Sequence, residues 1–458
     1  MDIPDALEPR FARTGTESEV LLFSGPLVIM SNTGRKATGQ GTISFRVRPS
    51  PQLSLHASVT TAVLGSGPLK VSWATGSGDL VGFHTTPLSS GMELRGRLSS
   101  PRLHPLQAED RAVEVRAELI NFPPAVIGSA AGRSVWTAAG LEFTLDRMPG
   151  AREAERLLKD GAGYALTHVI AIRREDANPI GVADFEAIAD TLYDALSFCA
   201  CSYVGIARAA GLDGSGARVW EIWDVSRTQF WSNRLSWLPP AKASSNPELP
   251  RPQRPLEVVM PQVMALSRRE PWSRNGIFRN LVASLCEGMR GSSVEIRLAT
   301  VLTGLELLAW CQLVLVSRIR TDDDFRGDFG PQLELLLTRC GICLDVPKAL
   351  PDLAHYAKTL KKGGVTGNGP RAIVEARNRV VHPPTHDRYV PEHSVREQAW
   401  LLALRYLELG ILEGCGYDGD PLPPWALSPP PPRILVEDEA TKEKLASKMG
   451  EGWWSEGA

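Results

Sequence analysis

The sequence predicts a multidomain α+β protein with a β-rich, sandwich-like N-terminal domain, an α/β middle region and an all-α C-terminal helical bundle. Three observations predict this order. Short segments up to about residue 148 alternate apolar and polar residues, which is the period of half-buried strands. Helical and extended segments then follow one another, and beyond residue 263 the apolar spacing is helical. The chain of 458 residues is 43% hydrophobic, so it can bury two or three cores.

Residues 1–148 are expected to form the β-rich domain. The alternation is clear in three segments, Ile43–Val47, Val113–Leu119 and Leu141–Leu145, and stretches rich in Gly, Ser and Pro separate them. Such a pattern indicates antiparallel sheet with one buried face, in a sandwich or a barrel. The histidines of this region are scattered, so the sequence predicts no catalytic cluster here.

Residues 149–240 are expected to form the α/β region, beginning with a short amphipathic helix that ends near Asp160. A strand over Tyr164–Ile172 and a helix from Val182 to about Ser202 follow. Four tryptophans lie close together near the end of this region. We interpret them as a packed aromatic core rather than as a platform on which bases stack. They are Trp220, Trp223, Trp231 and Trp237.

The third part of the chain begins after residues 241–262, a proline-rich stretch typical of a linker. The helical bundle is expected over residues 263–418. Within it, Ser394-Val-Arg-Glu397 has the spacing of a capping box and opens an apolar-striped helix that reaches about Leu412. Residues 419–458 are expected to form a proline-rich, extended tail with one short terminal helix.

The main candidate site is Arg377-Asn378-Arg379-Val380-Val381-His382, on one of the expected helices. Apolar residues before and after Arg377 fall within about 60° of its direction, so we expect it on a buried face. Asn378 and His382 are four residues apart and project from neighbouring positions. Pro383 ends the helix at His382, where the helix dipole favours a protonated imidazole. The three side chains could line one edge of a cleft.

This pattern also has a purely structural interpretation. Arg377 could form a buried ion pair, and His382 could donate hydrogen bonds to the last carbonyl groups of its helix. Neither residue would then have a catalytic role. Since a buried guanidinium needs a partner, a carboxylate on the central helix of the bundle is expected to face it. Glu306 is the carboxylate that the sequence offers, and we expect a Glu306–Arg377 ion pair.

Glu306 lies near the middle of Leu298–Val316, a segment apolar enough to suggest a membrane span. An acid at that position costs about 2.5–3.5 kcal/mol on insertion into a bilayer. We therefore expect a buried helix of the bundle and no membrane association.

In the Arg377 segment the sequence resembles the HEPN superfamily. Members of that superfamily carry an arginine, a polar residue, a few further positions and a histidine on a helix of a helical bundle. The match is Arg377, Asn378 and His382, and the resemblance covers about residues 270–415, where the helices look like those of ApeA-type abortive-infection proteins. The upstream segments that carry this likeness are Thr303–Trp310, Leu333–Leu337 and Gly369–Ile373.

The resemblance implies metal-independent cleavage of RNA, in which the 2′-hydroxyl attacks the adjacent phosphorus. His382 would move protons as general base or acid, because an unperturbed histidine pKa of about 6.5 suits neutral pH. Arg377 would stabilise charge on the phosphoryl oxygens, and Asn378 would position the phosphate or the histidine.

One histidine does not conveniently serve as base and acid at once, so we expect a homodimer that pairs two motifs through the helical domain. The resemblance also implies an antiviral role. In that role a phage-derived trigger would release the nuclease, and the N-terminal regions would act as sensor or restraint.

The formal charge of −2 excludes a general affinity for polyanions, so RNA would bind a local patch. Lys and Arg outnumber Asp and Glu between His355 and Arg396. Four of these cations are expected to contact the RNA backbone, although a solvated charged face would have the same composition. They are Lys361, Lys362, Arg371 and Arg379.

The seven cysteines are an odd, sparse set, which favours a reducing, cytoplasmic location over a disulfide framework. Cys199-Ala-Cys201 and Cys340-Gly-Ile-Cys343 lie too far apart for a paired zinc motif, so we interpret these cysteines as buried and apolar. The sequence has no phosphate-binding loop, dinucleotide fingerprint or nucleophile elbow. No metal or other cofactor is therefore expected.

A competing hypothesis uses the same residues without catalysis. In it, the helical domain is a HEPN-like module that pairs protomers or binds nucleotide. The β-rich domain would then recognise a protein or a glycan.

Overall fold

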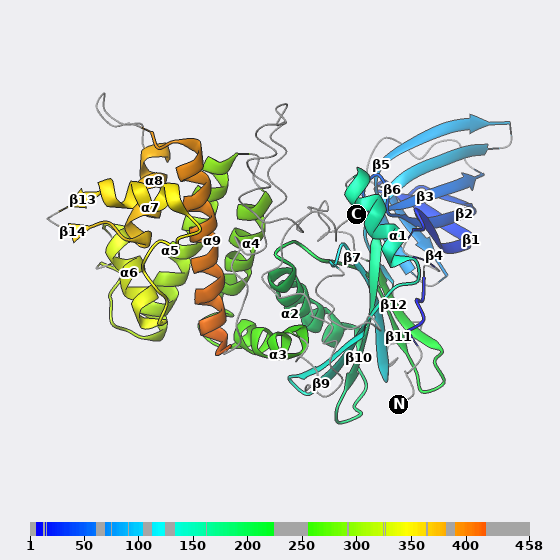
Figure 1. Cartoon of the computed structure of the whole chain (residues 1–458). Helices are drawn as coiled ribbons and strands as arrows, with labels where there is room; N and C mark the ends of the chain where they lie inside the picture. Colours follow the sequence, from blue (N-terminus) through cyan, green and yellow to red (C-terminus); the bar gives the residue numbers. More distant parts are fainter. Residues whose placement is uncertain are drawn as a thin grey trace.

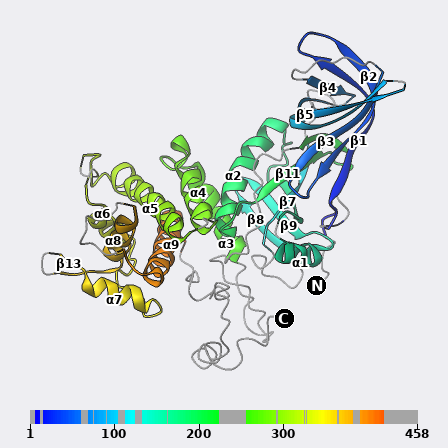
Figure 2. The same ribbon diagram turned by 90° about the horizontal axis from the view of Figure 1, so that it is seen from above.

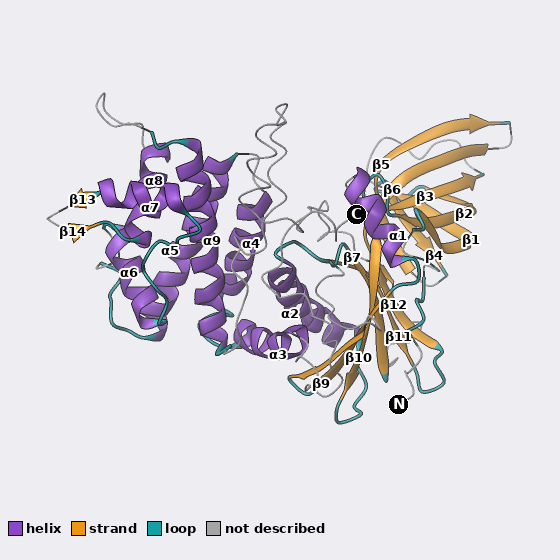
Figure 3. Cartoon of the chain, in the orientation of Figure 1, coloured by secondary structure: helices purple, strands orange, loops and turns teal. Residues whose placement is uncertain are grey.

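The computed structural model has a β-rich first part and a helical last part, as the sequence predicts (Figure 1, Figure 3). Expectations for the tail at 419–458, for most of the linker and for His382 fall outside the residues that it describes. It describes residues 6–11, 14, 16–60, 69–74, 76–89, 91–103, 112–123, 133–161, 163–223, 255–290, 293–323, 325, 327–362, 365–381 and 390–417.

Six N-terminal strands close into a barrel in the order β1-β2-β3-β6-β5-β4. Buried residues alternate with more exposed ones along β3 and β4 and along parts of the other strands, and Ile29, Ile43 and Phe45 are fully buried. Gly39 leaves no room for a side chain, because a Cβ there would lie 2.0 Å from the carbonyl oxygen of Ser58. The strands are β1 (Glu19–Ser31), β2 (Lys36–Arg46), β3 (Gln52–Val59), β4 (Leu69–Trp73), β5 (Gly76–Leu88) and β6 (Gly91–Leu103).

A second sheet of six strands follows, in the order β12-β11-β7-β10-β9-β8. Strands β7, β8 and β9 therefore pair with the middle region and not with the barrel. This corrects the predicted sandwich-like domain, because residues 1–148 divide between two sheets. Alternation identifies each strand but not its partners, which depend on contacts far apart in sequence. The strands are β7 (Glu114–Ile120), β8 (Arg133–Ala138), β9 (Leu141–Arg147), β10 (Leu166–Arg174), β11 (Gly205–Leu212) and β12 (Arg218–Trp223).

The two faces of the second sheet have different neighbours (Figure 1, Figure 2). Helices α2 (Val182–Ala200) and α3 (Pro255–Arg268) cover one face, where Phe143 belongs to the same core as the helices. The barrel packs on the other face, where the rings of Trp73 and Trp223 stack with centroids 6.0 Å apart. The sheet thus connects the barrel to the helical part of the chain.

The expected helix, strand and helix of the middle region are present as α1 (Ala151–Gly161), β10 and α2, with small shifts at their ends. Trp220 and Trp223 are each 2% exposed. They pack in cores, as interpreted from the sequence, and offer no free ring face to a base. Trp231 and Trp237 lie outside the described residues.

The helical domain is built around α5 (Val294–Trp310), which continues as the π-helix η3 (Cys311–Val316). A Cβ on Gly288 of α4 would lie 2.3 Å from a methyl group of Val301, so glycine is needed where these helices meet. The remaining elements are the short 3-10 turn η2 (Arg274–Gly276), α4 (Ile277–Arg290), α6 (Phe329–Arg339), α7 (Pro351–Thr359), β13 (Lys361–Lys362), β14 (Val365–Thr366), α8 (Gly369–Val381) and α9 (His393–Cys415).

Helix α5 with η3, Val294–Val316, has the length and composition of a membrane span, and 44% of its most apolar window is buried. It contacts α4, α6, α8 and α9, which is the environment of a core helix in a bundle. Its contacts therefore agree with the expected position of this segment within the helical bundle.

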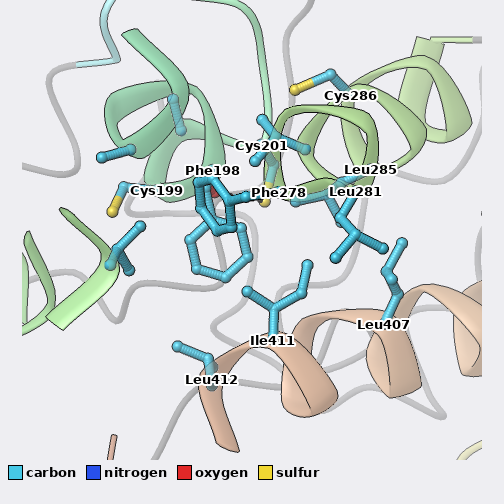
Figure 4. Close-up of a cluster of buried hydrophobic side chains, with 14 of the residues drawn as sticks. Phe198, Cys199, Cys201, Phe278, Leu281, Leu285, Cys286, Leu407, Ile411 and Leu412 are labelled. Atoms are coloured by element: carbon cyan, nitrogen blue, oxygen red, sulfur yellow. Dashed lines mark hydrogen bonds between the residues drawn. The ribbon is translucent and has the colours of Figure 1, made fainter. Parts of the chain in front are cut away.

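The middle region and the helical domain share one continuous hydrophobic core. Figure 4 shows Phe198 of α2 beside Phe278 and Leu281 of α4, with Ile411 of α9 below them. Because these side chains come from both parts, the bundle is not a separate body attached by a linker. Its position relative to the second sheet is set by packing.

Two predicted boundaries differ from the structure. The linker was expected to extend to residue 262, but α3 begins at Pro255, a residue that is well tolerated at the first helical position. The capping box at Ser394–Glu397 is not formed. Helix α9 begins at His393, one residue earlier, with Glu392 as its N-cap and without a side-chain capping bond.

Candidate functional site at the end of helix α8

Close backbone contacts hold the start of α8. Gly369 donates its N–H to the carbonyl oxygen of Leu344 at 2.8 Å, and a Cβ on Gly369 would lie 2.4 Å from the hydroxyl of Tyr406. The side chain of Asn368 accepts the backbone N–H of Arg371 at 3.1 Å, as a capping residue does. These contacts fix the register of α8 and therefore the direction of the side chains in its last turns.

Arg377 lies near the C-terminal end of α8 and faces α5. Its Nη2 donates to Oε1 of Glu306, and its Nη1 donates to Oδ1 of Asn378 at 3.0 Å. The structure therefore contains the Glu306–Arg377 ion pair that the sequence predicts. The side chain of Arg377 is 21% exposed and that of Glu306 is 37% exposed. The guanidinium is thus oriented by two partners, while part of the Arg377 side chain stays reachable from solvent.

The buried face of α8 differs in part from the predicted one. Ile373 is fully buried and Val374 is 6% exposed, as expected, but Val381 is 46% exposed. The apolar stripe does not continue to the end of the helix. The structure brings Arg377 and Asn378 together, while His382 lies outside the described residues.

The arginines expected to contact the RNA backbone are engaged in ion pairs of their own. Nε of Arg371 lies 2.6 Å from Oε1 of Glu334, and Nε of Arg379 lies 2.8 Å from Oε1 of Glu375. Together with Arg377, each arginine of α8 has a carboxylate partner. A phosphate at these residues would compete with a glutamate, which lowers the gain from each contact. The backbones of Lys361 and Lys362 form β13, and their side chains lie outside the described part.

Tyr356 is a neighbour that the sequence did not reveal. The guanidinium of Arg379 lies over its ring, 5.6 Å from the centroid. Burial raises the pKa of Tyr356 to about 12, so the phenol stays protonated at neutral pH. Its hydroxyl is buried without a hydrogen-bond partner among the described residues. The Glu375–Arg379 pair could have been found from its spacing of four residues, whereas Tyr356 and Glu334 come from other helices.

Among the residues that the structure describes, no group of three or more His, Cys, Asp or Glu side chains could hold a metal ion. Cys199 and Cys201 are buried, as interpreted from the sequence, but Cys343 is exposed, which corrects that interpretation for one cysteine. Burial raises the pKa of Cys340 to about 11, so this half-buried thiol stays protonated at neutral pH and is not an activated nucleophile.

Two family models match parts of this fold. Residues 112–234 match the YopA central domain, and residues 277–421 match the YopA C-terminal domain. The first range begins just before β7 and includes the second sheet, and the second contains the Arg377 motif. The chain is thus similar to YopA-type proteins in its middle and helical parts. No solved structure matches the chain.

A curated relative shares its name with these two domain families. The chain is 26% identical over 264 residues to the SPbeta prophage-derived uncharacterized protein YopA of Bacillus subtilis (strain 168). The match covers 57% of this chain and 55% of that protein, so it spans about half the length of the relative. That relative is described as uncharacterized, and the likeness therefore assigns no activity.

Proposed function

We propose that the protein is a metal-independent endoribonuclease of the HEPN type. The observation that carries the proposal is the orientation of Arg377 by Glu306 and Asn378 at the solvent-reachable end of α8, five positions before His382. In this proposal His382 moves protons, Arg377 stabilises the charge that develops on the phosphoryl oxygens, and the 2′-hydroxyl of the RNA is the nucleophile.

The ion pair of Arg377 is compatible with phosphate binding. A guanidinium has five N–H donors in a planar fork. The contacts to Glu306 and Asn378 use one donor on each Nη, so the remaining donors can meet a phosphate. A fixed guanidinium loses less conformational freedom when the phosphate arrives, which favours electrostatic stabilisation of the transition state.

The surface of α5 supports a homodimer through the helical domain. Ile296, Thr303, Leu307 and Trp310 are spaced by seven, four and three residues, so they lie on one face of α5, and each is at least partly exposed. Ile296 is 54% exposed. A second copy would cover this apolar strip and bring a second His382, so that one imidazole serves as base and the other as acid.

The biological setting is proposed from the resemblance and from the prophage-derived relative. A nuclease in a prophage-related protein would act in the cytoplasm against a competing phage. A phage-derived trigger would release the activity. The barrel and the second sheet would be the sensor or restraint, because they join the bundle through the core shared by α2, α4 and α9.

Purified protein and end-labelled RNA test this proposal. The wild-type chain should produce fragments that end in a cyclic phosphate, and His382→Ala and Arg377→Ala should each abolish them. His393→Ala is the matched control, since His393 is the first residue of α9 and exposed, and it should cut like the wild type. Equal activity in His382→Ala would refute the assignment.

The second candidate is the non-catalytic module. One observation favours it, which is that Arg371, Arg377 and Arg379 all have glutamate partners. Such a helix can pair protomers or bind a nucleotide without cutting RNA. Dimers that never cleave RNA, with or without infected-cell extract as a trigger, would support the module over the nuclease.

A further inference from the structure

A cavity of about 380 Å³ lies where four segments of the helical domain meet, away from the α8 motif in sequence. The segments are the residues just after α3, the π-helix η3, the last turn of α6 and the last turn of α9. The volume is in the range of small-molecule sites in proteins. Polar side chains that line it are Arg269, Gln312, Ser317, Arg339, Cys340 and Glu413.

The helix ends around the cavity have few free carbonyl acceptors. The carbonyl oxygens of Gln312, Leu337 and Leu412 accept backbone N–H groups at 2.9, 2.8 and 3.0 Å, which closes the last turns of η3, α6 and α9. The carbonyl oxygen of Gly414 accepts Nη2 of Arg269 at 2.9 Å. Because these carbonyl groups already accept hydrogen bonds, the side chains that line the cavity supply most of the groups that can bind a ligand there.

Two guanidinium groups from different elements line this cavity. In the described part of the chain, no carboxylate forms an ion pair with Arg269 or Arg339, in contrast to the arginines of α8. Glu413 is the single acid among the lining residues. The Cys340 thiol adds no second negative charge, because burial and the Glu413 carboxylate raise its pKa to about 11.

The π-helix adds two neutral donors to the same wall. Ser317 donates its backbone N–H to Gln312, five residues earlier. The wider turn of a π-helix brings residues with this spacing to one side, whereas an α-helix would separate them. Gln312 and Ser317 both line the cavity, so their side-chain amide and hydroxyl can join the two guanidinium groups there.

We infer that this cavity binds a small phosphate-bearing anion. Arg339 and Arg269 supply the charge, and Gln312 and Ser317 supply neutral donors. The planar fork of arginine fits two oxygens of a phosphate, and donors from separate elements can surround its remaining oxygens. This site is separate from the Arg377 motif and does not depend on ribonuclease activity.

Titration calorimetry of the full chain with inorganic pyrophosphate, at constant ionic strength, tests the inference. The wild type should show one saturable site, and Arg339→Gln should weaken it at least tenfold, with Arg339→Lys between the two. Arg339 is exposed and has no ion-pair partner in the described part, so this variant should unfold at the wild-type temperature.

Arg320→Gln is the matched control, because Arg320 is exposed and lies three residues beyond Ser317 without lining the cavity. It should bind pyrophosphate within about twofold of the wild type. Absence of saturable binding to the wild type, or an equal loss in Arg320→Gln, would overturn the inference. His382→Ala should retain binding, so failure of the ribonuclease proposal and failure of this one can be told apart.

Discussion

Removal of the Glu306–Arg377 ion pair is predicted to change both the stability of the protein and its cleavage of RNA. Glu306→Gln keeps the shape of the side chain and removes its charge. An exposed ion pair contributes about 0–1 kcal/mol, and breaking a buried one costs about 3–5 kcal/mol. The side chains of Arg377 and Glu306 are 21% and 37% exposed, so the energy of this pair is nearer that of an exposed ion pair. We therefore expect a loss of about 1 kcal/mol, or about 2–4 °C in the unfolding temperature of a domain of this size.

The same substitution should slow RNA cleavage, because Arg377 loses the partner that fixes its direction. A loss of about 1.4 kcal/mol in transition-state stabilisation corresponds to about tenfold in rate. Glu295→Gln is the matched control, since Glu295 also lies on α5 and pairs with Arg396 from another helix. It should lower stability by a similar amount and leave cleavage unchanged. Wild-type stability and cleavage in Glu306→Gln would refute the reasoning.

Three further predictions concern packing, pH and assembly. Gly369→Ala should cost about 1–3 kcal/mol by overpacking, because its Cβ would lie 2.9 Å from the carbonyl oxygen of Leu344; an unchanged urea midpoint would contradict this. Burial raises the pKa of the Glu408 carboxyl from its ordinary value of about 4.5 to about 8. The folded chain then keeps a proton that the unfolded chain releases, so stability should fall as pH rises from about 4.5 to 8. Glu408→Gln should weaken that decline in urea titrations at pH 5 and pH 8, and an equal decline in both proteins would exclude the explanation. Ile296→Glu should convert the dimer to a monomer in sedimentation equilibrium, and a wild-type monomer would remove the proposed interface.

Local patterns in the sequence predicted the elements well. The helix expected from Val182 and the strand expected over Tyr164–Ile172 are present as α2 and β10, because amphipathic spacing is a property of the segment itself. The pairing of β7 with β10 and β11 could not be predicted in the same way. It depends on which apolar faces meet after the chain has folded, and many pairings satisfy one alternating pattern.

In the candidate site, too, some contacts could be predicted from the sequence, and contacts between distant segments could not. The partner of Arg377 could be predicted because a guanidinium facing the bundle needs a carboxylate, and the central helix offers Glu306 near its middle. The partner of Arg371 could not, since Glu334 lies on α6 and nothing local relates the two. The two arginines that line the cavity could not be predicted as neighbours either. Arg269 and Arg339 are ordinary surface arginines in the sequence and become neighbours of one cavity only in the fold.

Cleavage of a short RNA that carries a single 2′-deoxy nucleotide tests the proposed chemistry most directly. The assay contains EDTA and compares this substrate with its all-ribose form. Metal-independent attack by the 2′-hydroxyl requires that the all-ribose RNA is cut in EDTA, and that the bond on the 3′ side of the deoxy nucleotide stays intact. Cleavage at the deoxy position, or loss of all cleavage on adding EDTA, would contradict a metal-independent HEPN-type ribonuclease.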